Sequence, residues 1–489
     1  MNSSNLVPIV IASLVVLLAG AVVAVLVSRR VRTSGDWLVA GRSLPLYVIV
    51  FTQFATAVGG GVLVAHVGLA YSSGWAYFFY PGFVFLGMVL LTVIARWLRE
   101  QEFSTVPDIL RRLYSEHRAI TVLAALACIV VPFGWLATQF VAFASLFSGI
   151  TGLSTVWLTV IMGAITLVFV VPGGLRSVAW SDFLFGVVML VMSVVIAGYV
   201  LNMAGGWSGI TSAVPSDLTD LPEGLGAAGT ATVMLWLFAI VPGTLTNQLY
   251  YQRIFSIKDI GQARKSLVIS GALVLVSGVY AFIIGLSARA MNPDLVDGNS
   301  EQAAGWVLAQ LPMVLMALYA AFLMATIVST TGSALQSVVT SAVQDVYVHA
   351  LGRQGGPHLV HLSRLLAVGV TILSALLAIA FPTALTWLVA TYAYSASVLA
   401  APIFIGYFLY RRGGTLRAGT ALAGIIGGVI GCATAHILGT TIPYAVFGIV
   451  ASVVCLLVAH MVLGRASTAT AATQPMAQAT TQAPAPVRD

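Results

Sequence analysis

Long apolar runs separated by short polar segments make up most of the chain. Each run is about 20 residues long, which is the length that an α-helix needs to cross a lipid bilayer. The pattern therefore predicts an all-α polytopic membrane protein with thirteen transmembrane helices. The runs cover approximately residues 6–28, 45–71, 76–96, 119–147, 154–171, 178–201, 230–249, 267–289, 312–343, 363–381, 385–410, 416–438 and 442–463.

The basic residues are distributed unevenly among the segments that connect these runs. If the N-terminus lies outside the cell, 21 of the 22 Lys and Arg residues fall in cytoplasmic segments, and only Arg289 lies outside. Cytoplasmic loops of membrane proteins carry this excess of positive charge. The first basic cluster follows the first run, which favours a retained helix over a cleaved signal peptide. We therefore expect a plasma-membrane protein with an external N-terminus and a cytoplasmic C-terminus.

Composition agrees with a membrane protein and argues against other classes. Charged residues make up 8% of the chain, against roughly 25% in a soluble domain. The net charge of +7 is spread over short loops, so it predicts no nucleic-acid-binding patch. The sequence contains neither a clustered set of His and acidic metal ligands nor a P-loop lysine, so we expect neither an enzyme nor a cofactor. A single transmembrane domain, residues 1–465, would precede a disordered cytoplasmic tail, residues 466–489, that is too short for a fused signalling domain.

Two of the runs contain residues that interrupt helices. The second run includes FATAVGGGVLVAH, residues 54–66, and the seventh includes AIVPGTLTN, residues 239–247. Many secondary transporters consist of two inverted repeats, each with one helix broken by Gly or Pro near the binding site. The five-run separation predicts a 5+5 core formed by runs 2–6 and 7–11. Alternatively, the small residues only allow close helix packing.

The repeats of this predicted core have approximate boundaries in the chain. Repeat one would span about residues 45–201 and repeat two about residues 230–410, with peripheral helices at 6–28 and 416–463.

An unwound segment at residues 57–61 would expose backbone carbonyls that an intact helix occupies. At least one glycine there would then need backbone angles that alanine resists. The ninth run offers further oxygen atoms in ATIVSTTGSALQS, residues 325–337, where Ser329 and Thr330 are neighbours and Thr326 lies one turn earlier. A small hard cation prefers such oxygen ligands. The alternative is that these hydroxyls bond carbonyls of their own helix.

Asp182 is the one acidic residue that falls inside a run rather than in a loop, at an edge or in the tail. A carboxylate within the membrane indicates a functional site, because a buried unpaired charge is costly. We find no Lys or Arg at the same depth to pair with it, so a bound cation is the expected partner. Pairing with Arg176 at the membrane edge, or service as a proton site, are the alternatives.

Four motifs make the chain resemble the sodium:solute symporter family, over nearly its whole length to about residue 465. They are WLVAGRSLP (37–45), VVPGGLRSVAWSDF (170–183), NQLYYQRIFSIKD (247–259) and IVSTTGSALQSVVTSAVQDVY (327–347). The resemblance implies an inverted-repeat transporter that uses Na⁺ as its coupling ion. It also implies that the sodium ligands are the carbonyls of Ala55, Val58 and Thr326 and the hydroxyls of Ser329 and Thr330, with Asp182 nearby.

Some positions depart from this family's patterns. Proline-type members have an acidic residue near Ala57, which this chain lacks. Members with a second sodium ion use two consecutive hydroxyls where this chain has Gly332 and Ser333, so Ser333 alone is the candidate for a second ion. Asn247 and Tyr250 match positions that touch or gate the substrate in sugar-type relatives.

The candidate solute cavity is formed by polar, aromatic or glycine positions in the repeat helices. These are Gln53, Gly59, Gly60, His66, Gln139, Asn247, Tyr250, Tyr392 and Tyr394. We expect a sodium-coupled symporter that imports a small polar organic solute by alternating access, an amino acid or related osmolyte being favoured. A proton-coupled carrier on the same fold, or a symporter for short monocarboxylates or choline-like cations, is the alternative.

Overall fold

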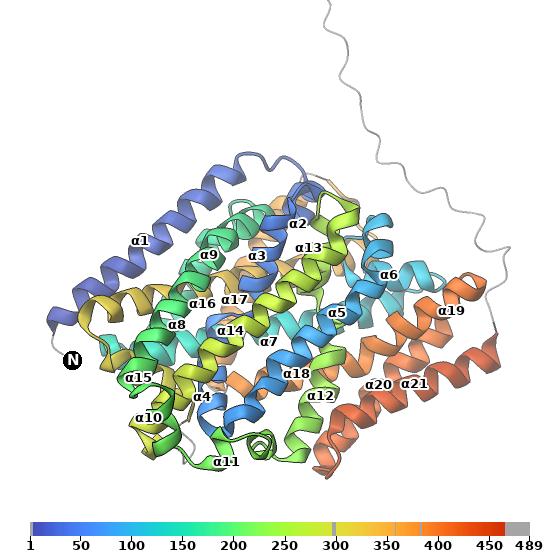
Figure 1. Ribbon diagram of the computed structural model, residues 1–489. Coiled ribbons are helices and arrows are strands. Elements are labelled where there is room, and N and C mark those ends of the chain that lie inside the picture. Colours follow the sequence, from blue (N-terminus) through green and yellow to red (C-terminus); the bar gives the residue numbers. More distant parts are fainter. Residues whose placement is uncertain (1–2, 296–299, 357, 382–383, 465–489) are drawn as a thin grey trace, which may run out of the picture.

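Helices form nearly all of the structure (Figure 1), a computed structural model that describes residues 3–295, 300–356, 358–381 and 384–464. The predicted tail, residues 466–489, lies outside the described residues. The first part of the chain forms α1 (Ser3–Ser28), α2 (Ser34–Val39), α3 (Leu46–Ala57), α4 (Gly60–Ser73), α5 (Phe79–Glu100), α6 (Val106–Leu113), α7 (Arg118–Thr151), α8 (Thr155–Val170) and α9 (Gly174–Met203).

The rest of the chain continues the helical pattern and includes two π-helical segments, Ala342–Ala350 and Ala401–Ile405. The middle part forms α10 (Gly206–Ala213), α11 (Ser216–Thr219), α12 (Thr230–Thr244), α13 (Gln248–Ser256), α14 (Ala263–Met291), α15 (Ala303–Gln310) and α16 (Met313–Ser341). The last part forms α17 (His358–Ala380), α18 (Ala384–Ala400), α19 (Gly406–Gly413), α20 (Ala418–Leu438) and α21 (Tyr444–Leu463).

The apolar runs of the sequence coincide with these helices. Within the described residues, 11 helical segments are long and apolar enough to cross a membrane by length and composition. One of them, Leu63–Glu100, combines α4 with α5, and two further apolar helices, Leu46–Ala57 and Thr155–Val170, are shorter. The all-helical membrane fold is therefore confirmed, whereas thirteen crossings and the inverted repeat remain predictions.

Helix α16 lies in the core of the bundle. It is the most deeply buried of the candidate spans, since 78% of its most apolar stretch is inside the protein. Helix α1 packs against α9 and α16 at one edge, while α20 and α21 pair at the opposite edge beside α18 (Figure 1). The part of α16 from Tyr319 to Ser341 is thus shielded from lipid, which allows the many hydroxyls of this helix to face other helices.

The first helix break is shorter than the sequence predicted. Helix α3 ends at Ala57, Val58 caps it, and Gly59 is already the N-terminal cap of α4, so residues 60 and 61 are helical rather than unwound. Gly59 has φ −63° and ψ 161°, an extended conformation that any residue adopts. The expectation of a glycine-specific backbone angle is therefore wrong at this position.

The second break lies a few residues beyond the predicted one. Pro242 and Gly243 remain inside α12, which ends at Thr244. Helix α13 begins after Asn247, whose side-chain carbonyl accepts a hydrogen bond from the Leu249 N–H at 3.0 Å. Asn247 thus caps the second half of the interrupted helix.

Candidate ion and solute site

The end of α3 faces the hydroxyl groups of α16. The Ser329 hydroxyl donates to the Ala55 carbonyl at 3.2 Å and to the Thr326 carbonyl at 3.0 Å. The Thr330 hydroxyl donates to the Ala55 carbonyl at 3.1 Å and to the Thr56 carbonyl at 3.2 Å. Oxygen atoms of residues 274 and 275 positions apart in sequence therefore converge at the end of α3. Oxygen atoms are the ligands that a sodium ion prefers.

Bonding within α16 accounts for the hydroxyls of Thr326 and Thr331, for only one of the two contacts of Ser329, and for neither contact of Thr330. Thr326 donates to the Leu323 carbonyl at 2.7 Å, and Thr331 donates to the Ile327 carbonyl, both within the same helix. Ser329 and Thr330, by contrast, each reach across to α3. Since in-helix bonding satisfies a hydroxyl without a partner helix, the contacts across the break distinguish these two residues from their neighbours.

Asp182, on α9, is completely buried near the candidate ion site. One of its carboxylate oxygens, Oδ2, accepts hydrogen bonds from Thr52 at 2.7 Å and from Ser333 at 2.9 Å. The other, Oδ1, has no hydrogen-bond partner among the described residues. A carboxylate oxygen that is buried without a partner is suited to a cation.

The expectation that no basic residue can pair with Asp182 is wrong. The Arg253 guanidinium of α13 lies 3.7 Å from Asp182 Oδ2, and both side chains are buried. The alternative partner, Arg176, instead donates to the Ala40 carbonyl at 3.1 Å and to the Ser43 hydroxyl at 2.6 Å. Arg253 was assigned to a loop because it follows the apolar run. In the structure it lies on α13, the second half of the broken helix, which is directed toward the protein core.

The Arg253 guanidinium also lies beside Ser333, the candidate ligand of a second sodium ion. Its guanidinium donates to the hydroxyls of Thr52 at 3.3 Å and Thr56 at 3.1 Å, and to the hydroxyl of Ser333. A positive group already fills the space between these oxygens. Such an arrangement disfavours a second cation at Ser333, because like charges in a buried site repel each other strongly.

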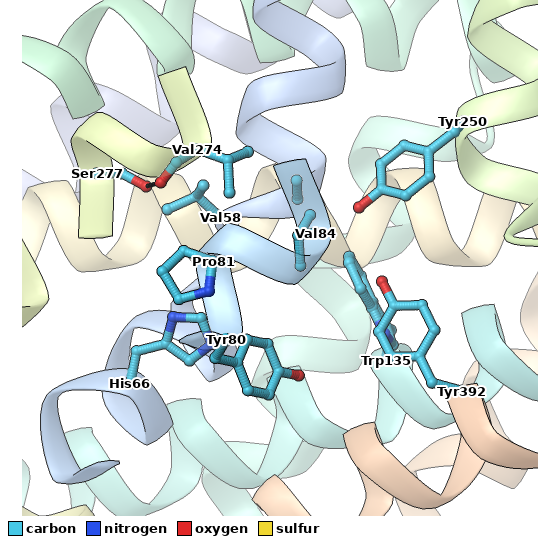
Figure 2. Close-up of a pocket in the computed structure, with 11 residues that line it drawn as sticks. Val58, His66, Tyr80, Pro81, Val84, Trp135, Tyr250, Val274, Ser277 and Tyr392 are labelled. Atoms are coloured by element: carbon cyan, nitrogen blue, oxygen red, sulfur yellow. Dashed lines mark hydrogen bonds between the residues drawn. The ribbon is translucent and has the colours of Figure 1, made fainter. Parts of the chain in front are cut away.

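A small cavity of about 10 Å³ lies next to the helix break, and five of its eleven lining residues carry aromatic rings (Figure 2). Three of the predicted solute residues, His66, Tyr250 and Tyr392, line it, and Val58 connects it to the end of α3. The remaining lining residues are Ala57, Tyr80, Pro81, Val84, Trp135, Val274 and Ser277.

Several other predicted cavity residues lie elsewhere. Gln53 accepts a hydrogen bond from Ser270 at 2.9 Å, and Gln139 is buried in α7 without lining this cavity. Tyr394 bonds His436 at 3.0 Å, on the side of α18 that faces α20. Gln53 and Tyr394 thus have the expected polar or aromatic character but face α14 and α20 rather than this cavity.

Asn247 supports the cavity without lining it. Its side-chain amide donates to the Tyr392 hydroxyl at 3.4 Å while its carbonyl oxygen caps α13. This contact links the second helix break to the aromatic wall on α18.

Gly59 and Gly60 lie where the start of α4 approaches α16 closely. A Cβ atom at Gly59 would overlap the Thr330 side chain, and one at Gly60 would overlap the Ile327 side chain. The glycines therefore serve packing rather than an unusual backbone conformation.

Sequence reasoning missed five residues of the site and its cavity. Thr52 and Thr56, one turn apart on α3, carried a weak signal, because they place two hydroxyls on one helix face. Tyr80 and Trp135 carried none, since aromatic residues are common in membrane helices. Arg253 was visible only as a basic residue in a polar stretch.

Interrupted helices whose carbonyls meet hydroxyls of a buried neighbouring helix are typical of secondary transporters. The model of the sodium:solute symporter family matches residues 37–428, most of the chain. The protein therefore belongs to this family, as the four motifs indicated. Its curated relatives are sodium-coupled transporters rather than enzymes, and sodium, not an organic cofactor, is their coupling ion.

Individual relatives are distant. The sodium/glucose cotransporter of Vibrio parahaemolyticus is 23% identical, over 71% of this chain and 69% of its own length. The sodium/pantothenate symporter of Escherichia coli is 26% identical, over 82% of this chain and 86% of its own length. The chain spans only 58% of the rabbit sodium/glucose cotransporter 1, which is 23% identical over 71% of this chain.

Solved structures share the fold. A sodium-coupled sialic acid symporter, in a substrate-bound outward-open state, is 20% identical, with a TM-score of 0.81 over 94% of this chain and 98% of that one. A nucleobase-cation symporter matches with 15% identity and a TM-score of 0.63, over 89% of this chain and 97% of that one. These likenesses establish a transporter fold.

Proposed function

We propose that the protein is a sodium-coupled symporter that imports a small polar organic solute by alternating access, an amino acid or related osmolyte being favoured. One sodium ion would bind the carbonyls of Ala55, Val58 and Thr326 and the hydroxyls of Ser329 and Thr330. The single observation that carries this proposal is the pair of hydroxyls on α16 that meets the Ala55 carbonyl at the end of α3. Ligands shared between two helices allow an ion to stabilise one conformation of a transporter.

The proposed solute site adjoins the proposed ion site through Val58, which belongs to both. An ion that fixes the broken helix would therefore also order one wall of the cavity, and this gives sodium a route to favour solute binding. In the proposed orientation the protein lies in the plasma membrane with its N-terminus outside and its C-terminus in the cytoplasm. This orientation rests on the distribution of basic residues.

The ion-pair geometry favours sodium coupling over proton coupling through Asp182. A proton site must gain and lose its proton during transport, whereas Asp182 has a guanidinium at 3.7 Å and two hydroxyl donors. These neighbours stabilise the charged carboxylate against the opposing cost of its complete burial.

Thermal unfolding of the detergent-solubilised protein distinguishes the two coupling ions without knowledge of the solute. At fixed pH and ionic strength, we expect NaCl to raise the unfolding temperature relative to KCl in a concentration-dependent way, because a ligand that binds only the folded state stabilises it. A purely proton-coupled carrier would respond to pH and not to the exchange of sodium for potassium.

Alanine substitutions test the sodium ligands individually. We expect Ser329→Ala and Thr330→Ala each to raise the sodium concentration needed for half-maximal thermal stabilisation by about tenfold or more, since hydrogen bonds or ligands to a charged group contribute about 1.5–3 kcal/mol. The matched control is Ser337→Ala, two turns further along α16, which should leave the sodium dependence unchanged. Equal small shifts in all three variants would contradict the assignment.

A further inference from the structure

Helix α6 begins with two buried hydrogen bonds that join it to different parts of the bundle. The Thr105 hydroxyl donates to Asp345 Oδ1 at 2.6 Å, in the π-helical segment that continues α16. The Val106 N–H donates to the side-chain carbonyl of Gln248 at 2.9 Å, at the start of α13. Helix α6 therefore bridges the second half of the broken helix and the end of α16. π-helical turns are frequent at functional sites.

Helices α2 and α6 start with the same capping arrangement but direct the threonine hydroxyl differently. Asp36 accepts a hydrogen bond from the Thr33 N–H at 3.1 Å, and Asp108 accepts one from the Thr105 N–H at 3.0 Å. The Thr33 hydroxyl donates to its own Asp36 at 2.9 Å. The Thr105 hydroxyl instead donates to Asp345, 240 residues further along the chain. Capping of α6 alone therefore does not account for this contact.

A row of buried polar side chains connects the surroundings of the candidate ion site with Asp345. Its members are spaced four residues apart on one side of α16 and its π-helical continuation, and they are Ser333, Ser337, Ser341 and Asp345. Among the described residues, neither the Ser337 hydroxyl nor Asp345 Oδ2 has a hydrogen-bond partner. Such atoms are costly to bury, and the cost is relieved in a conformation that admits water.

The outer side of the Asp345 contact adjoins a surface cavity. Arg111 of α6 lies 3.8 Å from Asp345 and donates to His349 Nε2 at 3.2 Å. Arg111 and the exposed His349 both line a cavity of about 440 Å³. The contacts of α6 with Asp345 therefore lie between this cavity and the buried polar row.

We propose that α6 closes a cytoplasmic release path along the polar row of α16, and that the hydrogen bond between Thr105 and Asp345 is the latch. This inference rests on the proposed symport function and orientation, and it assigns the route by which the ion leaves. Thr105 and Asp345 are positioning residues, because they hold one conformation and do not bind the transported ion.

The two hydrogen bonds of α6 have different roles in this opening. If the latch breaks while the Val106 contact to Gln248 holds, α6 and α13 move away from α16 together. Arg253, which α13 carries, then withdraws from Ser333 and no longer opposes the passage of a cation. Water enters along the polar row, and the sodium ion can leave the end of α3.

A single cysteine in the polar row reports whether the path is open. The reporter is Ser337→Cys in the full chain, with the three native cysteines replaced by alanine. Inverted membrane vesicles expose the cytoplasmic face to a membrane-impermeant thiol reagent, 2-(trimethylammonium)ethyl methanethiosulfonate. We expect slow modification in this parent, because residue 337 is buried. Sodium should slow it further relative to potassium, since the proposed ion holds α3 against α16.

Substitutions at the latch should open the path. Thr105→Val keeps the side-chain shape but removes the hydroxyl, and we expect it to raise the modification rate at least tenfold, because hydrogen bonds to charged groups are among the stronger ones. Asp345→Asn weakens the same bond from the other side and should also raise the rate. Thr105→Ser, which restores the hydroxyl, should stay within about threefold of the parent. The matched control is Thr33→Val on α2, which should also stay within about threefold.

Two results would overturn the inference. One is an unchanged modification rate in Thr105→Val and Asp345→Asn variants that keep the unfolding temperature of the parent. The other is equal acceleration by Thr33→Val and Thr105→Val, which would indicate a general effect of helix capping. Failure of the symport proposal would look different, because sodium and potassium would give equal rates in every variant while Thr105→Val still reacted faster than the parent.

Discussion

Alanine at Gly59 or Gly60 is expected to abolish most sodium-driven uptake in protein that still reaches the membrane. The added Cβ atom would overlap Thr330 in the first variant and Ile327 in the second. Because Thr330 is a proposed ligand and its hydroxyl contacts the Ala55 carbonyl at 3.1 Å, separation of α4 from α16 would open the ion site. Overpacking of this kind costs about 1–3 kcal/mol, so we expect uptake to fall at least tenfold.

Gly198→Ala provides the matched control for this prediction. Gly198 lies inside α9, and a Cβ atom there would meet nothing within 4 Å. Ordinary helix propensity then predicts stabilisation by roughly 0.5–1 kcal/mol with uptake unchanged. Uptake should be measured per molecule of protein in the membrane, together with the unfolding temperature. Fully active Gly59→Ala and Gly60→Ala variants with raised unfolding temperatures would show that α4 and α16 tolerate a wider separation.

The helices and the contact between α3 and the hydroxyls of α16 could be predicted because each leaves a local signal. Apolar runs specify membrane helices directly. Consecutive glycines located the first break to within a few residues, and adjacent hydroxyls at Ser329 and Thr330 stood out in an apolar helix. The sequence predicted that Gly59 and Gly60 are needed for an unusual backbone conformation, but they are needed for close contact with α16. That contact depends on which helix lies opposite, and this cannot be read from the sequence.

The partner of Asp182 could not be predicted, because its position depends on a break that redirects the chain. The segment QLYYQRIFS resembles a polar stretch at a membrane surface, yet all nine residues of α13 are buried. Helix α13 continues an interrupted helix into the core, where Arg253 meets hydroxyls from α3 and α16. Tyr80 and Trp135 were missed as cavity residues for a similar reason, since they are far apart in sequence and neither differs locally from a lipid-facing aromatic residue.

Single substitutions in the buried ion pair of Asp182 and Arg253 are expected to destabilise the protein more than the double substitution does. Arg253→Gln would leave Asp182 buried without its guanidinium, and Asp182→Asn would leave Arg253 buried without its carboxylate. Removal of one member of a buried pair typically destabilises by about 3–5 kcal/mol, whereas replacement of both by neutral groups is often tolerated. We therefore expect each single variant to lower the unfolding temperature and the amount of folded protein strongly, and the double variant to recover most of both.

An exposed ion pair in the same protein supplies the control for this cycle. Arg96 and Glu100 are 2.7 Å apart on α5, but their side chains are 67% and 40% exposed. Surface pairs contribute about 0–1 kcal/mol because water and salt screen them, so Arg96→Gln should have little effect under the same conditions.

Arg253 has further hydrogen bonds to Thr52, Thr56 and Ser333, and Gln can retain only part of this set, so recovery in the double variant will be incomplete. If the two single effects instead add in the double variant, Asp182 and Arg253 are stabilised independently. The carboxylate would then be free to serve the sodium ion without its arginine neighbour.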